Sequence, residues 1–112
     1  MSSYFKDISK IQYEGVDSNN PLGFKYYDED KVVLGKKMKD HLRFATCYWH
    51  TFTWPGLDPF GGPTFERPWM QQGDPIEKAE EKLDEAFDFF DKITTPFFCF
   101  HDRDISPEGK NY

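Results

Sequence analysis

The sequence has little positive charge and no long hydrophobic run. Its 14 Lys and Arg residues are outnumbered by 20 Asp and Glu residues, which gives a net charge of −6. Because there is no basic stripe to displace counterions from phosphates, we expect no nucleic-acid partner. No apolar stretch approaches the length of a membrane span, and the first ten residues lack the apolar core of a signal peptide. We therefore expect no membrane partner and a cytoplasmic location.

Cysteine is also scarce. Cys47 and Cys99 are the two in the sequence, and each lies within an apolar run, where thiols are usually buried and inert. The sequence has no Cys-x-x-Cys pair and no zinc-binding spacing. We expect both thiols to stay reduced in the cytosol.

Aromatic residues, by contrast, are abundant. They make up 19% of the chain although the mean hydropathy is only −0.78, and many of them lie in segments rich in proline and glycine. Rings held in such loops usually line a pocket, cover a core or contact another chain.

Residues 1–42 are predicted to form an N-terminal arm and a short helix. The arm, up to Asp30, is polar and carries turn signals such as Glu14-Gly15 and Asn19-Asn20-Pro21. Residues 28–42 are predicted to form a turn followed by the helix. Seven apolar residues are expected to anchor the arm to something larger: Tyr4, Phe5, Ile8, Ile11, Tyr13, Leu22 and Phe24.

Residues 43–112 are predicted to form a strand, a long loop, a helix and a second strand. Arg43–Phe52 and Phe97–Phe100 are apolar or β-branched almost throughout, as in strands buried on both faces. Between them, Thr51–Gly73 is dense in turn formers. Its aromatic rings argue against disorder. The loop is then either functional, as long loops in compact domains usually are, or packed by its own rings.

The helix is predicted over Pro75–Ile93, with Asp74 as its N-cap and Glu77 completing a capping box. Its acidic residues are expected to form a solvated face. An apolar stripe at spacings of three and four forms the other face: Ile76, Ala79, Leu83, Ala86, Phe87, Phe90 and Ile93. Two strands joined by one helix predict a parallel pair with a right-handed crossover. No second helix is present to cover the other side of the sheet, so the pattern describes a piece of a domain.

The candidate site lies where the second strand ends. The strand runs directly into His101, Asp102 and Asp104, and parallel sheets and barrels place their chemistry at such ends. A turn would bring the Asp104 carboxylate to one ring nitrogen of His101 and leave the other free for proton transfer. The alternative is a hydrogen-bonded histidine with two solvated turn residues. Convergence of the first strand's Trp49 and His50 on the same rim favours the catalytic interpretation.

Several of these motifs together resemble xylose isomerase, in the bacterial form with a long N-terminal arm. The resemblance covers the whole chain in register. Four stretches match the long-armed form: Tyr13-Glu14-Gly15, Asn20-Pro21-Leu22, Gly35-Lys36-Lys37-Met38-Lys39 and His41-Leu42-Arg43-Phe44. The others are Tyr48-Trp49-His50-Thr51-Phe52, Asp58-Pro59-Phe60-Gly61-Gly62, Arg67-Pro68-Trp69, Phe98-Cys99-Phe100-His101-Asp102-Arg103-Asp104 and Pro107-Glu108-Gly109.

The resemblance implies a (β/α)₈ barrel, known as a TIM barrel, that works as a homotetramer. Such an enzyme interconverts D-xylose and D-xylulose, and also D-glucose and D-fructose, by ring opening and a metal-assisted hydride shift. It uses two divalent cations, Mg²⁺, Mn²⁺ or Co²⁺. A barrel of this type takes roughly 250 residues or more. The chain is therefore expected to be the N-terminal arm and first β-α-β unit of a longer isomerase.

The resemblance also implies roles for individual residues. His101 matches the histidine that assists ring opening, and Asp104 matches the aspartate that orients it. Trp49 matches a tryptophan that walls the sugar site, and Phe60 matches a phenylalanine that reaches into the neighbouring subunit's site. The metal ligands come from later strands, so the resemblance implies no metal-binding residue in this chain and no activity for the chain alone.

Two other functions remain open at this point. The chain could be a non-catalytic sugar-binding module with Trp49, Trp54 and Trp69 as stacking platforms, although the capped helix counts against the β-sandwich usual for such modules. It could also be an assembly piece whose arm and Phe60 loop bind another subunit without chemistry.

Overall fold

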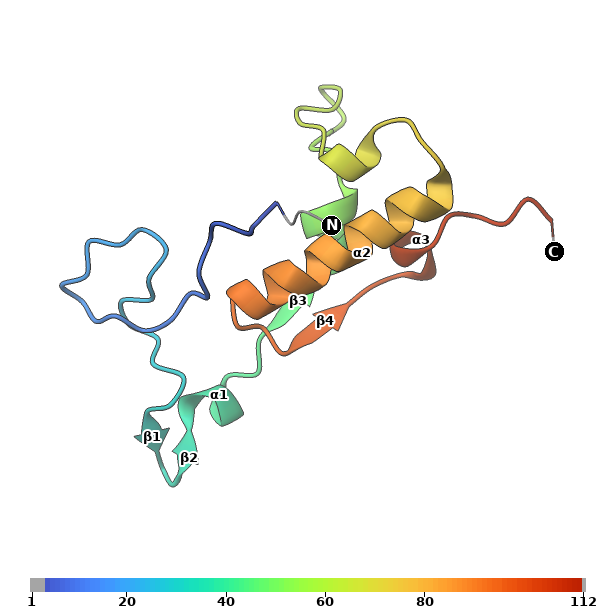
Figure 1. The fold of residues 1–112 in the computed structure, drawn as a ribbon. Helices are drawn as coiled ribbons and strands as arrows, with labels where there is room; N and C mark the ends of the chain where they lie inside the picture. Colours follow the sequence, from blue (N-terminus) through green and yellow to red (C-terminus); the bar gives the residue numbers. More distant parts are fainter. Residues whose placement is uncertain (1–3, 112) are drawn as a thin grey trace.

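The computed structural model describes residues 4–111, and it is a small mixed arrangement of helices and strands (Figure 1). Two two-stranded sheets are present in this range. The elements follow the chain in this order: β1 Val32–Val33, β2 Lys36–Lys37, α1 Met38–His41, β3 Ala45–Cys47, the π-helical turn η1 Trp49–Thr53, the 3-10 turn η2 Pro68–Met70, α2 Pro75–Lys92, β4 Phe97–Cys99 and α3 Asp102–Ile105.

The central unit consists of β3, α2 and β4. The two strands pair in parallel, with Thr46 opposite Phe98 and Cys47 opposite Cys99. This confirms the predicted parallel pair joined by one helix, because a parallel partner can be reached only through a crossover connection. The right-handed sense of that crossover stays a prediction.

Helix α2 begins at the predicted N-cap and proline. The Asp74 side chain accepts hydrogen bonds from the backbone N–H groups of Ile76 (2.9 Å) and Glu77 (3.1 Å), and Pro75 occupies the first helical position. Proline suits that position because its missing N–H would have no partner there. The helix ends at Lys92, one residue before the predicted end, and Thr94 follows with a positive φ of 60°.

The first strand is shorter than predicted. Arg43–Phe52 was expected to be extended throughout, but β3 stops at Cys47 and the chain winds into η1. The hydroxyl of Thr51 donates a hydrogen bond to the Cys47 carbonyl at 2.9 Å. This bond gives the carbonyl a donor at the point where the strand ends. A short apolar run does not distinguish a strand from a buried helical turn, which is why its pattern was misleading.

Burial of the strands on both faces is also not observed within residues 4–111. Thr46 is buried and its hydroxyl is bonded to that of Thr95 at 2.8 Å, whereas Ala45, Phe97 and Cys99 are exposed. Cys99 therefore differs from the buried thiol expected from its apolar run. Both cysteines are free, as predicted.

The hydrophobic core lies between the β3–β4 pair, η1 and α2. It combines rings from the long loop with the inner face of the helix, and its buried members are Tyr48, Phe52, Trp69, Ala86 and Phe90. The Trp69 indole N–H donates to the Phe52 carbonyl at 2.8 Å. The loop thus packs on its own rings at its two ends, which is one of the two interpretations left open by the sequence.

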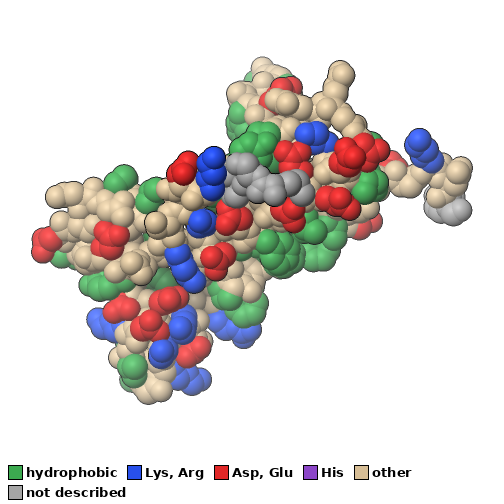
Figure 2. Space-filling model, viewed as in Figure 1, with side chains coloured by type: hydrophobic (Ala, Val, Ile, Leu, Met, Phe, Trp, Pro, Cys, Tyr) green, Lys and Arg blue, Asp and Glu red, His purple; other side chains and the backbone are tan. Residues whose placement is uncertain are grey.

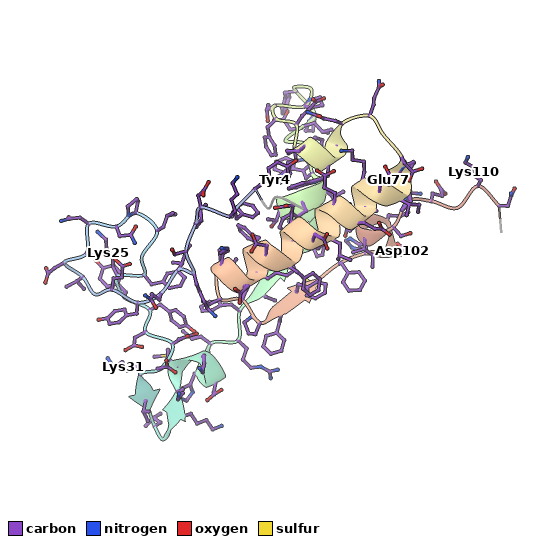
Figure 3. All side chains as sticks on the ribbon, in the orientation of Figure 1. Tyr4, Lys25, Lys31, Glu77, Asp102 and Lys110 are labelled. Carbon is purple, nitrogen blue, oxygen red and sulfur yellow. The ribbon has the colours of Figure 1, made fainter. Side chains whose placement is uncertain are left out.

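Helix α2 has a less uniform polar face than predicted. Acidic side chains gather over it in Figure 2, and hydrophobic side chains lie along the side where Figure 1 shows β4. Glu85, however, is only 4% exposed. Its Oε2 atom accepts the backbone N–H of Tyr4 at 3.0 Å, and the Tyr4 hydroxyl donates to Glu81 at 3.0 Å. Figure 3 shows Tyr4 beside α2. The expectation of a wholly solvated face is therefore wrong at Glu85.

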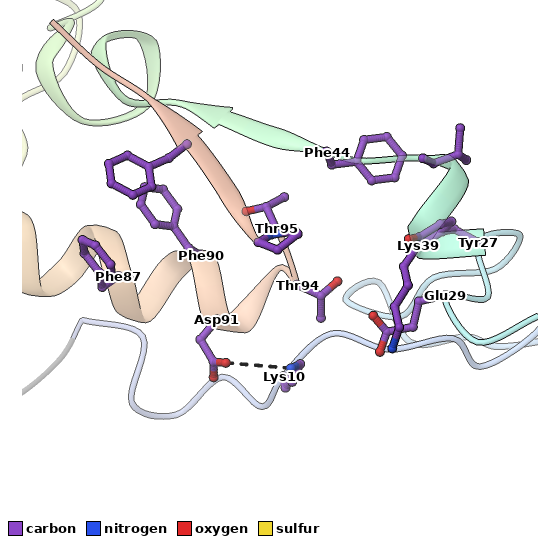
Figure 4. Close-up of a pocket in the computed structure, with 13 residues that line it drawn as sticks. Lys10, Tyr27, Glu29, Lys39, Phe44, Phe87, Phe90, Asp91, Thr94 and Thr95 are labelled. Carbon is purple, nitrogen blue, oxygen red and sulfur yellow. Dashed lines mark ion pairs between the residues drawn. The ribbon is translucent and has the colours of Figure 1, made fainter. Parts of the chain in front are cut away.

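The N-terminal arm runs along α2 to the end of the helix. The Phe5 ring lies 5.5 Å from the Phe89 ring, and the Ile11 N–H donates to the Lys92 carbonyl at 2.7 Å. Lys10 pairs with Asp91 at 3.8 Å on the rim of a cavity of about 400 Å³ (Figure 4). Of the predicted anchors, Tyr4, Tyr13 and Leu22 remain largely exposed within the described residues.

A hairpin precedes the short helix and was not predicted. β1 and β2 pair antiparallel, and the two residues between them, Leu34 and Gly35, both have positive φ. Such tight turns favour glycine, so Gly35 is the one local signal for the hairpin. No helix among the described residues is long and apolar enough to cross a membrane.

Candidate functional site

The candidate site forms at the ends of β3 and β4. Because the strands are parallel and in register, the residues that follow them emerge at the same edge. Trp49 comes two residues after Cys47, and His101 two residues after Cys99. Their ring centroids are 4.5 Å apart with an interplanar angle of 46°. The predicted convergence of Trp49 and His101 is confirmed.

His101 and Asp104 form a bonded pair at the start of α3. The Asp104 Oδ2 atom accepts the His101 backbone N–H at 2.7 Å and lies 3.1 Å from the ring Nδ1. His101 is the N-cap of α3, so the first helical turn itself carries Asp104 back to the imidazole. The contact expected from the three-residue spacing is present.

The two members of this pair differ sharply in exposure. The Asp104 side chain is 7% exposed, whereas the His101 side chain is 67% exposed. An ionised carboxylate can only accept hydrogen bonds, so Asp104 places the proton of neutral His101 on Nδ1. The Nε2 atom is then free to take a proton from a bound molecule.

Two ionisable side chains near Asp104 were not singled out from the sequence. Tyr48 is fully buried, and its hydroxyl has no hydrogen-bond partner among the described residues. Burial, with a smaller contribution from the Asp104 charge, raises the pKa of Tyr48 to about 12. The Lys82 ammonium lies 5.6 Å from the centre of the Tyr48 ring. The sequence pattern did not distinguish either residue, because Tyr48 lies within an apolar run and Lys82 within a charged helix face.

Other residues named from the sequence lie at the edge of the site or apart from it. His50 is exposed, and its ring lies 5.7 Å from Trp49 and 6.2 Å from Trp54. Asp102, which Figure 3 labels, is exposed, and its side chain accepts the N–H of the next residue. Phe60 is 99% exposed on a turn where the Asp58 side chain accepts its backbone N–H at 2.7 Å, so its ring stands in solvent.

Metal binding is not supported by the described side chains. Residues 4–111 contain no group of three or more His, Cys, Asp or Glu residues that could hold a metal ion. The two divalent cations implied by the resemblance therefore have no fitting site among these residues.

Comparison with known proteins identifies the chain's relatives. No protein-family model matches it. The xylose isomerase of Photobacterium profundum is 59% identical over 109 residues, which is 97% of this chain and 25% of that protein. Those of Rhizobium etli and Pseudoalteromonas atlantica are 60% and 56% identical over 111 residues, which is 99% of this chain and 25% of each relative. The chain is similar to the N-terminal part of xylose isomerase. The resemblance inferred from its motifs is confirmed.

The chain spans about a quarter of the length of the xylose isomerases that it matches. The stretch of similarity contains the His101–Asp104 pair, Trp49 and Phe60.

Proposed function

We propose that this chain supplies the ring-opening part of an aldose–ketose isomerase. The substrates are D-xylose and D-xylulose, and also D-glucose and D-fructose. The observation that carries the proposal is the His101–Asp104 pair with Trp49 against the same imidazole, found in a chain similar to xylose isomerase. The sequence resemblance implies a role in the sugar site for each of these three residues.

The chemistry assigned to His101 is a proton transfer. Nε2 takes the proton from the anomeric hydroxyl of the cyclic sugar, the electron pair of that O–H bond forms the C1 carbonyl, and the bond between C1 and the ring oxygen breaks. The ring oxygen receives the proton, so the imidazole ends as it began. An imidazole suits this exchange because it titrates near neutrality.

Asp104 and Trp49 prepare His101 for that transfer. Asp104 holds the ring through Nδ1 and stabilises the positive charge that forms while the proton is on Nε2. Trp49 lies close beside the imidazole and offers an apolar wall against which a sugar ring can lie. Phe60 acts elsewhere: the resemblance assigns it to the sugar site of a neighbouring subunit in a homotetramer, and its full exposure supports that role.

In the proposed architecture the chain is the start of a longer (β/α)₈ barrel in the cytoplasm. Residues 1–42 form the arm and short helix, and residues 43–112 form the first β-α-β unit. The parallel β3–β4 pair, with Phe90 of α2 stacked on Phe98 of β4, supports this assignment. Two divalent cations belong to the proposed enzyme, but no step assigned to residues 4–111 runs through them because those residues offer no site.

Of the alternatives, a sugar-binding module with three tryptophan platforms is disfavoured by Trp69. Its ring is buried in the core and its N–H is bonded to Phe52, so it presents no face to a sugar. A chain that served only in subunit assembly would not need the bonded His101–Asp104 pair.

The test is a hybrid enzyme in which residues 1–112 replace the matching N-terminal segment of the Photobacterium profundum xylose isomerase. We expect the hybrid to convert D-xylose to D-xylulose. In the hybrid, His101→Gln should lower kcat/KM for D-xylose by about 10²–10⁴-fold, the range typical of a positioned acid–base group. An inactive hybrid that assembles normally, or a His101→Gln variant with full activity, would refute the proposal.

A further inference from the structure

A second cavity, of about 190 Å³, is lined by residues of η1, η2, α2 and α3. Phe52 and Trp69 belong to its apolar wall, and both are members of the hydrophobic core. Cavities that bind extended ligands usually measure about 300–1,000 Å³. This smaller cavity therefore suits a small ion.

The charged residues of the cavity lining are all cations. Lys78 and Lys82 come from α2, Arg103 comes from α3, and no Asp or Glu residue is part of the described lining. The chain as a whole carries a net charge of −6, so this concentration of positive charge differs from the rest of the molecule. A recess lined by charges of one sign concentrates ions of the opposite sign.

The three cations differ in how far they are already paired. Lys78 pairs with Glu81 at 2.8 Å, and Arg103, which is exposed, pairs with Glu108 at 2.5 Å. Lys82 is half-buried and makes no ion pair among residues 4–111; its ammonium lies 5.6 Å from the centre of the Tyr48 ring. Lys82 is therefore the cation that most lacks a counter-ion.

A neutral donor in the same lining is also unpaired. Thr53 lines the cavity, and its hydroxyl is buried without a hydrogen-bond partner within the described part of the chain. Folded proteins leave few buried hydroxyls unsatisfied, and an ion or a water molecule is a common explanation where one occurs. A hydroxyl can donate to an oxyanion as well as accept.

We propose that this cavity binds a small oxyanion of the phosphate type, which is either inorganic phosphate or the phosphate group of a monoester. Lys82 supplies the main opposite charge, and the Arg103 guanidinium offers two N–H donors to two phosphate oxygens. Phosphate suits donors from several elements because it carries more than one negative charge and several acceptor oxygens. The inference does not depend on the proposed function, because it involves none of the residues assigned to the sugar.

The experiment is a calorimetric titration of the hybrid enzyme with inorganic phosphate at constant ionic strength. We expect a saturable site in this chain that Lys82→Gln weakens by about 10- to 150-fold, the value of one hydrogen bond to a charged group. Arg103→Gln should weaken binding by only about 2- to 5-fold, because that side chain is exposed and already paired. Lys82→Arg keeps the charge and should retain most of the affinity.

Lys92→Gln is the matched control. It removes the same charge from the same helix, but Lys92 pairs with Asp88 and is not part of the cavity lining. We expect its phosphate affinity to stay within about twofold of the parent hybrid. His101→Gln should also bind phosphate normally, which separates this site from the proposed sugar site.

Titration with glycerol phosphate distinguishes the two sources of the ligand. Tighter binding than inorganic phosphate would identify a phosphate monoester, whereas equal or weaker binding would identify free phosphate. The proposal would be overturned by the absence of a saturable site, by unchanged affinity in Lys82→Gln, or by an equal loss in Lys92→Gln. A loss of phosphate binding in His101→Gln would also overturn it, because the phosphate would then occupy the sugar site.

Discussion

Replacing Asp104 by Asn tests how much of the pair's function depends on charge. Asn keeps the size of the side chain and one oxygen that can accept the His101 backbone N–H, now bonded at 2.7 Å. It loses the negative charge that faces Nδ1 at 3.1 Å. The protonated imidazole formed during ring opening is then no longer stabilised by an anion.

The size of the effect follows from those two contacts. A hydrogen bond to a charged group contributes about 1.5–3 kcal/mol, and each step of about 1.36 kcal/mol corresponds to a factor of ten in rate. Both contacts are made by Oδ2, and the Asn oxygen can take its place, so the loss comes from the missing negative charge and has the full charged contact to the ring as its upper bound. We expect kcat/KM for D-xylose in the hybrid enzyme to fall by about 10- to 150-fold.

The assay is the initial rate of D-xylulose formation at several D-xylose concentrations. The loss should appear in kcat and stay smaller than the loss in His101→Gln. A loss as large as that of His101→Gln would mean that Asp104 does more than orient and stabilise the imidazole. An unchanged kcat/KM would refute the coupling of the two residues.

Three further predictions concern the rest of the chain, and each is measured in the hybrid enzyme. Phe60→Ser should raise KM or lower kcat for D-xylose, because the proposed function assigns this exposed ring to the sugar site of a neighbouring subunit; equal kcat/KM would count against this. Thr94→Gly should stabilise the fold by about 0.5–1 kcal/mol in thermal unfolding, since a β-branched residue is strained at a φ of 60°; Thr95→Gly, which removes a 2.8 Å bond to Thr46, should destabilise it. The parent should lose stability between about pH 10 and 12, because the pKa of Tyr48 is about 12 in the folded state and about 10 in the unfolded state. Its neutral phenol stabilises the fold below pH 10, and this contribution is lost as the phenol ionises. Tyr48→Phe should abolish this loss of stability. Identical changes in Tm from about pH 9 to 11 for Tyr48→Phe and the parent would refute the last prediction.

The parallel unit and the histidine pair could be predicted from the sequence because their signals are local. Asp74, Pro75 and the helical stripe define the start of α2, and the run before His101 defines β4. The contact between His101 and Asp104 follows from three-residue spacing at a helix start, so it needed no information from distant parts of the chain.

Features that depend on distant partners could not be predicted. Glu85 is buried because Tyr4, far away in the sequence, donates its N–H to the carboxylate. Lys82 carries the same local signal as any solvated lysine on a helix, and only the packing of α2 on the Tyr48 ring distinguishes it. The β1–β2 hairpin could not be predicted because strands of two residues are too short to show the alternation of apolar and polar residues.

A comparison of two substrates in the His101→Gln hybrid tests the central claim most directly. D-Xylose must be opened, whereas D-glyceraldehyde has too few carbons to close a sugar ring. If His101 opens the sugar ring, the variant hybrid should lose about 10²–10⁴-fold of its kcat/KM for D-xylose while converting D-glyceraldehyde to dihydroxyacetone at close to the parent rate. A loss of the same size on both substrates would contradict the claim, because it would place His101 in a step that an open-chain aldose also requires.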